Sequence, residues 1–305
     1  METGQGFSFY RIHILQSLQP GDWSTGLHLL RFIEDLPDAY GHVRYKPVET
    51  AADLFNALLE IRDELITTGQ IPLIHIEAHG DIKGLCLTSG DVVEWNDLKE
   101  VLTEINIACQ ANLLVAVAAC LGENLVSMAR LHEPAPFWGC IGPRGEEQSG
   151  MLHDNFKRFY SKLLEEGNLR AALEAADGGL PTEGKPLVFW PAEFFLAAVF
   201  RAYVKEFGGE YLRDRAELIA REIKFTSEVD IEVSEETKVA MAAALGSYEP
   251  IFEECRRIFL MLDRFPEIEK RFMVKFSHVQ GESAPNSGPQ SSSLEEIENG
   301  QEACP

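Results

Sequence analysis

The chain has 305 residues, and its 49 Asp and Glu residues against 27 Lys and Arg residues give a formal net charge of −22. A charge this negative repels phosphate backbones and anionic membrane surfaces, so we expect the protein to bind neither nucleic acid nor a membrane directly. Hydrophobic residues make up 45% of the chain and charged residues 25%, which is typical of a folded globular protein and excludes a fibrous or wholly disordered chain.

The first 80 residues alternate strand and helix patterns. Pro20-Gly21-Asp22 predicts a turn after the first strand. Thr50 is expected to cap the second helix, whose apolar side chains recur on one face. The patterns predict strands over residues 7–15, 42–48 and 71–77, and helices over residues 25–35 and 51–67.

The alternation continues to about residue 190. Residues 84–87 and 92–95 flank Ser89-Gly90-Asp91, which predicts a hairpin. Residues 112–119 form an almost purely apolar run between two predicted helices, a pattern typical of a central parallel strand covered on both faces. Further helices are expected over residues 96–108, 122–131 and 151–166, and further strands over residues 137–141 and 186–190.

This order of elements predicts an α/β fold, with a mainly parallel sheet of about six strands between helices. We assign residues 1–200 to this domain. Residues 201–278 show helical patterns without strands and are expected to form an accessory segment. Residues 279–305 are rich in Ser, Pro, Gly and acidic side chains and cannot bury enough apolar surface to offset chain entropy, so we expect a disordered acidic tail.

The cysteine positions and the absence of known motifs exclude several classes of protein. The longest apolar runs are shorter than the roughly 18–20 residues that span a bilayer, and the amino terminus lacks the features of a secretory signal. No phosphate-binding glycine loop, zinc-binding H-E-x-x-H or G-x-S-x-G nucleophile motif is present, so we expect no cofactor and no metal. The cysteines form no C-x-x-C pair, which predicts free thiols in a cytoplasmic protein. They are Cys86, Cys109, Cys120, Cys140, Cys255 and Cys304.

Two predicted strands end in residues that could act together. The third strand runs into His79-Gly80, and the central apolar strand runs into Cys120. In an open parallel sheet the ligand crevice lies at the carboxyl ends of the strands, so neighbouring strands would bring this imidazole and this thiol face to face. A cysteine thiol, with an ordinary pKa near ~8.5, is mostly protonated at neutral pH, and an adjacent imidazole can accept its proton. The N–H groups of Gly80 and Cys120 could form an oxyanion hole, and the dipole of the helix expected from Gly122 would favour the thiolate.

This arrangement resembles the caspase-like cysteine peptidases. His79-Gly80 follows one strand and Ala119-Cys120 the next, and the histidine and the cysteine are 41 positions apart. Ala119-Cys120-Leu121-Gly122 keeps the small-Cys-x-Gly skeleton of the caspase signature. Within that group the chain is most similar to the CHAT-domain branch (caspase HetF associated with TPRs), through residues 74–80, 84–90, 95–98 and 113–120.

The resemblance covers roughly residues 1–200. It implies a caspase/hemoglobinase-like sandwich, with Cys120 as the nucleophile and His79 as the general acid and base. It also implies a switched effector in bacterial defence or cell death, which a sensor or regulatory protein activates and which cleaves a protein substrate.

The chain departs from this family at two positions linked to specificity. Leu121 stands where caspases carry Arg, and Ala118 stands where metacaspase-like enzymes carry Asp, so the preferred scissile residue stays open. Asp81 and Leu121 are candidates for the substrate cleft, with a solvated loop carboxylate as the second interpretation of Asp81. No third catalytic residue is evident, although Glu77 shares a strand face with His79 and could orient its ring or contact a buried Arg. His75, deeper in the strand, is expected to be a hydrogen-bonded core histidine.

The leading interpretation is a cysteine endopeptidase that cleaves a protein through a His–Cys dyad. The alternative is a catalytically inactive caspase-like scaffold or regulatory protein-binding module, and a third possibility is an amidase that uses Cys120 on a small molecule. The presence of both His79 and Cys120 favours an enzyme, because a scaffold has no physical need for a thiol and an imidazole at adjacent strand ends.

Overall fold

The protein is described here from a computed structural model, which covers residues 7–37, 41–146, 148–206, 213–220, 234–245 and 248–279. Seven strands pair side by side in one sheet, and a hairpin extends one of them, which makes nine strands rather than about six. In spatial order the seven are β2 (Val43–Pro47), β1 (Arg11–Ser17), β3 (Pro72–Gly80), β6 (Leu114–Ala118), β7 (Gly139–Pro143), β9 (Leu187–Pro191) and β8 (Gly178–Gly179).

All neighbouring strands in this row are parallel except β7 and β9. β4 (Gly84–Cys86) and β5 (Val92–Glu94) form the hairpin that their turn residues predicted. The hairpin also pairs with the end of β3, through β4. Every residue of β6 is buried, which confirms the prediction of a central strand. The expectation of an α/β fold with a mostly parallel sheet between helices is therefore confirmed.

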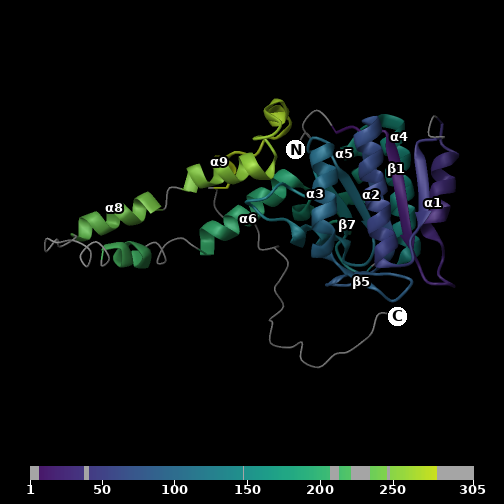
Figure 1. Cartoon of the computed structure of the whole chain (residues 1–305), viewed down its shortest axis with the longest axis horizontal. Helices are drawn as coiled ribbons and strands as arrows, with labels where there is room; N and C mark the ends of the chain where they lie inside the picture. The colour runs from purple at the N-terminus through teal and green to yellow at the C-terminus, as the bar shows by residue number, and fades with distance from the viewer. Residues whose placement is uncertain are drawn as a thin grey trace, which may run out of the picture.

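Helices cover both faces of the sheet (Figure 1). One face carries α2 (Ala51–Thr68) and α3 (Lys99–Ala108), and the other carries α1 (Thr25–Glu34), α4 (Ser149–Glu166) and α5 (Leu169–Ala175). The start of α2 forms as its sequence predicted: the Thr50 hydroxyl accepts the N–H of Asp53, and the Asp53 carboxylate accepts the N–H of Thr50.

The predicted helix over residues 122–131 is wrong in type. The chain instead forms a 3₁₀-helix, η2 (Gly122–Met128), which begins after Leu121 in a left-handed conformation with φ of +56°. The reason is a close turn over the end of β6: a Cβ at Gly122 would lie 2.9 Å from the carbonyl oxygen of Val117. Another 3₁₀-helix, η1 (Trp95–Leu98), leads into α3.

The described residues beyond the sheet are mainly helical. It contains α6 (Ala192–Glu206), α8 (Glu235–Leu245), α9 (Tyr248–Phe259), η4 (Pro266–Arg271) and η5 (Phe276–His278), and residues 213–220 are also helical. These helices lie to one side of the sheet, in green and yellow in Figure 1.

Part of this helical region packs on the sheet domain. Phe259 stacks on Phe195 with ring centroids 5.9 Å apart, and its carbonyl accepts the N–H of Ala135. Their buried side chains belong to the same core cluster as the strands. The division at residue 200 stays a prediction, and the predicted tail after Val279 lies outside the described residues.

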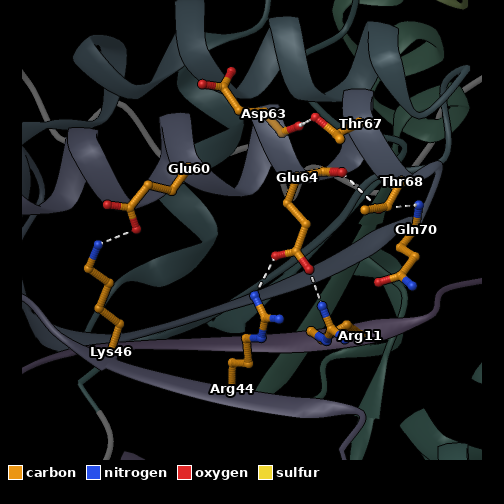
Figure 2. A network of polar contacts seen from close by, with 9 residues as sticks. All are labelled: Arg11, Arg44, Lys46, Glu60, Asp63, Glu64, Thr67, Thr68 and Gln70. Atoms are coloured by element: carbon orange, nitrogen blue, oxygen red, sulfur yellow. Dashed lines mark hydrogen bonds and ion pairs between the residues drawn. The ribbon is translucent and has the colours of Figure 1, made fainter.

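On the α2 face, ion pairs tie α2 to β1 and β2 (Figure 2). Glu64 accepts hydrogen bonds from both Arg11 and Arg44, and Lys46 pairs with Glu60. The two basic side chains bonded to Glu64 differ in exposure, 11% for Arg11 and 57% for Arg44. Among the residues that the structure describes, none of the helices is both long enough and apolar enough to cross a membrane.

Candidate active site

His79 and Cys120 come directly after the pairing of two adjacent strands. The parallel ladder of β3 and β6 ends with Glu77 opposite Ala118, and His79 and Cys120 each follow two residues later. Because side chains alternate along β3, His79 shares a face with Glu77, whose carboxylate accepts the hydroxyl of Thr25 on α1. Cys120 follows the end of β6 in a turn. Both are accessible, since the His79 side chain is 38% exposed and Cys120 is half-buried.

Gly80 brings the backbone of β3 against that of Cys120. A Cβ added at Gly80 would lie 2.7 Å from the carbonyl oxygen of Cys120 and 3.0 Å from the Cβ of Ala119. Any other residue would push the two strand ends apart. The glycine after His79 is therefore needed for the close approach of the two chain segments that carry the dyad.

The backbone of Gly80 also lies near the backbone nitrogen of Cys120, which would be 3.6 Å from a Cβ added at Gly80. The carbonyl of Ile71 faces β1, where it accepts the N–H of Tyr10. Because these directions alternate along a strand, the N–H of Gly80 faces the β6 side of β3.

His79 has a carboxylate partner that the sequence did not reveal. Its Nε2 lies 2.8 Å from Oδ2 of Asp22, which stands in the loop between β1 and α1. The same oxygen accepts the N–H of Gln19 at 2.9 Å, which holds the carboxylate in place. The hydrogen bond with His79 is the main cause that lowers the pKa of Asp22. Asp22 is thus an anion at neutral pH that holds the His79 ring through Nε2.

Glu77 makes no direct hydrogen bond to His79, and in the described part of the chain no arginine is hydrogen-bonded to it. Its carboxylate accepts the Thr25 hydroxyl on one oxygen and lies 3.1 Å from Nε2 of His75 on the other. The second ring nitrogen of His75 lies 2.9 Å from the hydroxyl of Tyr160. His75 is fully buried, which confirms the prediction of a hydrogen-bonded core histidine.

The two residues proposed for the substrate cleft flank the dyad. Asp81 accepts the N–H groups of Lys83 and Gly84 through Oδ1, at 2.7 and 3.0 Å, and so supports the turn into β4. Leu121 is half-buried, and its N–H donates to the carbonyl of Gly145 in the loop after β7. These contacts explain how both are held, and a role toward substrate stays a prediction for each.

Cys86 is disulfide-bonded, so the prediction of free thiols is wrong for this residue. Three other described cysteines, Cys109, Cys140 and Cys255, are free but poor nucleophiles. Burial raises the pKa of Cys109 to about 12 and raises the pKa of Cys140 still further. Cys255 on α9 also lies near a histidine, with 3.7 Å between its Sγ and Nδ1 of His132. However, Cys255 is only 1% exposed and burial raises its pKa, so this thiol is neither accessible nor activated.

The helix dipole that was expected to favour the Cys120 thiolate is missing. The helix after Cys120, η2, is a short 3₁₀-helix and cannot supply the dipole of an α-helix.

Asp22 is the residue of the candidate site that sequence reasoning missed, because Pro20-Gly21-Asp22 predicted only a turn. A usable signal was present: in a parallel sheet all carboxyl ends share one edge, so the loop after the first strand is a candidate neighbour of His79. The loop reaches His79 because β1 lies beside β3 in the sheet.

A comparison of the chain with protein-family models finds no match, and a comparison with curated proteins finds none either. The site is therefore interpreted from its own geometry. In the described part of the chain, no group of three or more His, Cys, Asp and Glu side chains could hold a metal ion.

Proposed function

We propose that the protein is a cysteine peptidase that uses Cys120 as its nucleophile and His79 as its general acid and base. The observation that carries this proposal is the placement of the two residues, each two positions beyond the last paired residues of adjacent parallel strands. The contact of Gly80 with the Cys120 backbone supports it, because it holds the two strand ends together.

In the proposed reaction, Nδ1 of His79 accepts the proton of the Cys120 thiol, and the thiolate attacks the scissile carbonyl. The imidazolium then protonates the leaving amine, which produces a thioester on Cys120. Water, deprotonated by His79, hydrolyses the thioester and restores the thiol. Asp22 stabilises the imidazolium that forms in each step, because its carboxylate is hydrogen-bonded to the other ring nitrogen.

The oxyanion of each tetrahedral intermediate would lie between the N–H groups of Gly80 and Cys120. The close approach of the Gly80 and Cys120 backbones supports this assignment, because preorganised N–H donors are the usual means of stabilising such a charge.

A peptide chloromethyl ketone tests this proposal directly. We expect it to alkylate Cys120 in the full chain, with labelling located by mass spectrometry, and we expect His79→Ala to slow the labelling strongly. Cys255→Ala is the matched control, since it removes the other histidine-contacting thiol and should leave the labelling unchanged. A thiol at position 120 that stays inert, or that reacts equally well without His79, would favour the inactive scaffold.

The substrate is proposed to be a protein, and its cleavage site can be found by sequencing new amino termini. Fragments of the chain itself and of proteins encoded beside it should appear with the wild type and be absent with Cys120→Ala. The further proposal, a switched effector in bacterial defence or cell death with an activating partner, is supported by the resemblance to caspase-like and CHAT-domain peptidases.

A further inference from the structure

The polar contact between Thr25 and Glu77 lies directly beneath the proposed dyad. Both side chains are buried, with 4% and 3% exposure, and the Thr25 hydroxyl donates to the Glu77 carboxylate. A carboxylate only accepts hydrogen bonds, so Nε2–H of His75 must donate to its other oxygen. Glu77 is thus held from both sides, and its oxygen provides a fixed acceptor for Thr25.

Thr25 is also the first residue of α1 and stands three residues after Asp22. The start of α1 is attached to β1 as well, because the side-chain oxygen of Gln16 accepts the N–H of Leu27 at 3.2 Å. The short segment that carries Asp22 is therefore tied at its far end to two strands. One of these ties runs to β3, the strand that carries His79.

From this arrangement we infer that Thr25 and Glu77 are positioning residues that set Asp22 against His79. Glu77 and His79 are two residues apart on the same face of β3, so the strand fixes their separation. The hydrogen bond from Thr25 to Glu77 holds the start of α1, and with it the loop that carries Asp22, in a fixed position relative to β3. In that position Asp22 is hydrogen-bonded to Nε2 of His79. The inference rests on the proposed function, because the benefit of this arrangement is a correctly oriented and stabilised imidazolium.

The rate of alkylation of Cys120 by chloroacetamide, measured by mass spectrometry on the full chain, tests this without a peptide substrate. We expect Asp22→Asn to slow the reaction about tenfold, which is the low end of what a hydrogen bond to a charged group contributes. Thr25→Val should slow it about threefold to tenfold by the same reasoning. Thr25→Ser keeps the hydroxyl and should restore the wild-type rate.

Non-additivity separates positioning from a general loss of stability. If Thr25 acts through Asp22, the double variant with Thr25→Val and Asp22→Asn should react as slowly as Asp22→Asn alone. Thr50→Val is the matched control: it removes a hydroxyl at the start of α2 and should lower the melting temperature without changing the alkylation rate. Should Thr25→Val fail to fold, the smaller Thr25→Ala carries the same expectation.

The inference is overturned if Thr25→Val leaves the alkylation rate unchanged. It is also overturned if the double variant is slowed by the product of the two single-variant factors, which would mean that Thr25 and Asp22 act independently. The proposed function fails in a different way, with an alkylation rate that is insensitive to His79→Ala. A rate that depends on His79 but not on Thr25 therefore refutes the positioning role and leaves the dyad in place.

Discussion

The two faces of the same sheet use charged and polar side chains in different ways. On the α2 face, Arg11 and Arg44 share Glu64 near the start of β1, and each charge has an opposite charge beside it (Figure 2). On the face covered by α1 and α4, polar residues continue along β3 to its carboxyl end, where His79 is left accessible.

The difference shows that clusters of charge do not by themselves indicate a reactive site. The ion pairs of the α2 face are complete within the protein and fasten a helix to the sheet. At the end of β3, by contrast, Cys120 and His79 lie beside loops and are accessible to solvent. Position relative to the strand end and accessibility are what separate the two groups.

The largest expected effect is on turnover. Cys120→Ala or His79→Ala should reduce cleavage by at least about 10³-fold, because each removes a reacting group. Both residues lie at strand ends, so the free energy of unfolding should change by less than about 1 kcal/mol.

Cys140→Ala should give the opposite result in the same assays, with lower stability and unchanged cleavage. Cys140 is fully buried in β7, and its truncation should cost about 1–2 kcal/mol of unfolding free energy with cleavage nearly unchanged. Substrate cleavage and chemical denaturation measured on all three variants check this separation. Activity that survives in Cys120→Ala, or that is lost in a folded Cys140→Ala, contradicts the assignment.

On the α2 face, His13 is expected to make the free energy of unfolding depend on pH. Burial, followed by the nearby charges of Arg44 and Arg11, lowers the pKa of His13 to about 4 from 6.5. The unfolded chain therefore binds a proton between these two pH values that the folded protein does not, so stability falls as pH falls from 6.5 to 4. At 1.36 kcal/mol per pH unit, the maximum loss is about 3 kcal/mol.

His13→Gln tests this sign. Gln does not titrate, so the variant should lose less unfolding free energy than the wild type between pH 6.5 and 4, by up to about 3 kcal/mol, measured by urea denaturation at each pH. The difference between the two proteins at pH 7 serves as the reference. Parallel pH profiles would mean that His13 titrates normally in the folded state.

Much of this fold was readable from the sequence because its signals are local. The apolar runs before His79 and after Asn112 predict buried strands, and their polar ends predict a site at the carboxyl edge. The residues that were missed depend on long-range pairing: Asp22 reaches His79 only because β1 lies beside β3.

Two further elements escaped prediction for physical reasons. Strand β8 consists of two glycines, Gly178 and Gly179, which carry no hydrophobic pattern. The 3₁₀-helix after Leu121 follows from the tight turn over β6, a tertiary constraint that overrides the helical pattern in the sequence.

Beneath the proposed site, Tyr160→Phe should have a smaller but clear effect. The change removes the hydroxyl that meets Nδ1 of His75 and leaves a buried nitrogen without that partner, which should cost about 1–3 kcal/mol of unfolding free energy. Tyr10→Phe is the control, because Tyr10 is 41% exposed and its change should stay within about 0.5 kcal/mol. Equal values for the two variants would show that the buried network contributes little.

The smallest effect is expected within the ion pairs of the α2 face, where two basic residues differ mainly in burial. Lys46 and Glu60 are 40% and 67% exposed, so water and salt screen their attraction, and Lys46→Met should change the unfolding free energy by less than about 0.5 kcal/mol. Arg11 is only 11% exposed and Glu64 20%, so Arg11→Met leaves a half-buried carboxylate paired only with the exposed Arg44. This change should lower the unfolding free energy by about 1–2 kcal/mol.

Denaturation at low salt and at 1 M salt distinguishes the two pairs, because only the exposed pair should weaken markedly with salt. If both variants behave alike, burial is not what sets the strength of these pairs, and the α2 face holds its helix by packing rather than by charge.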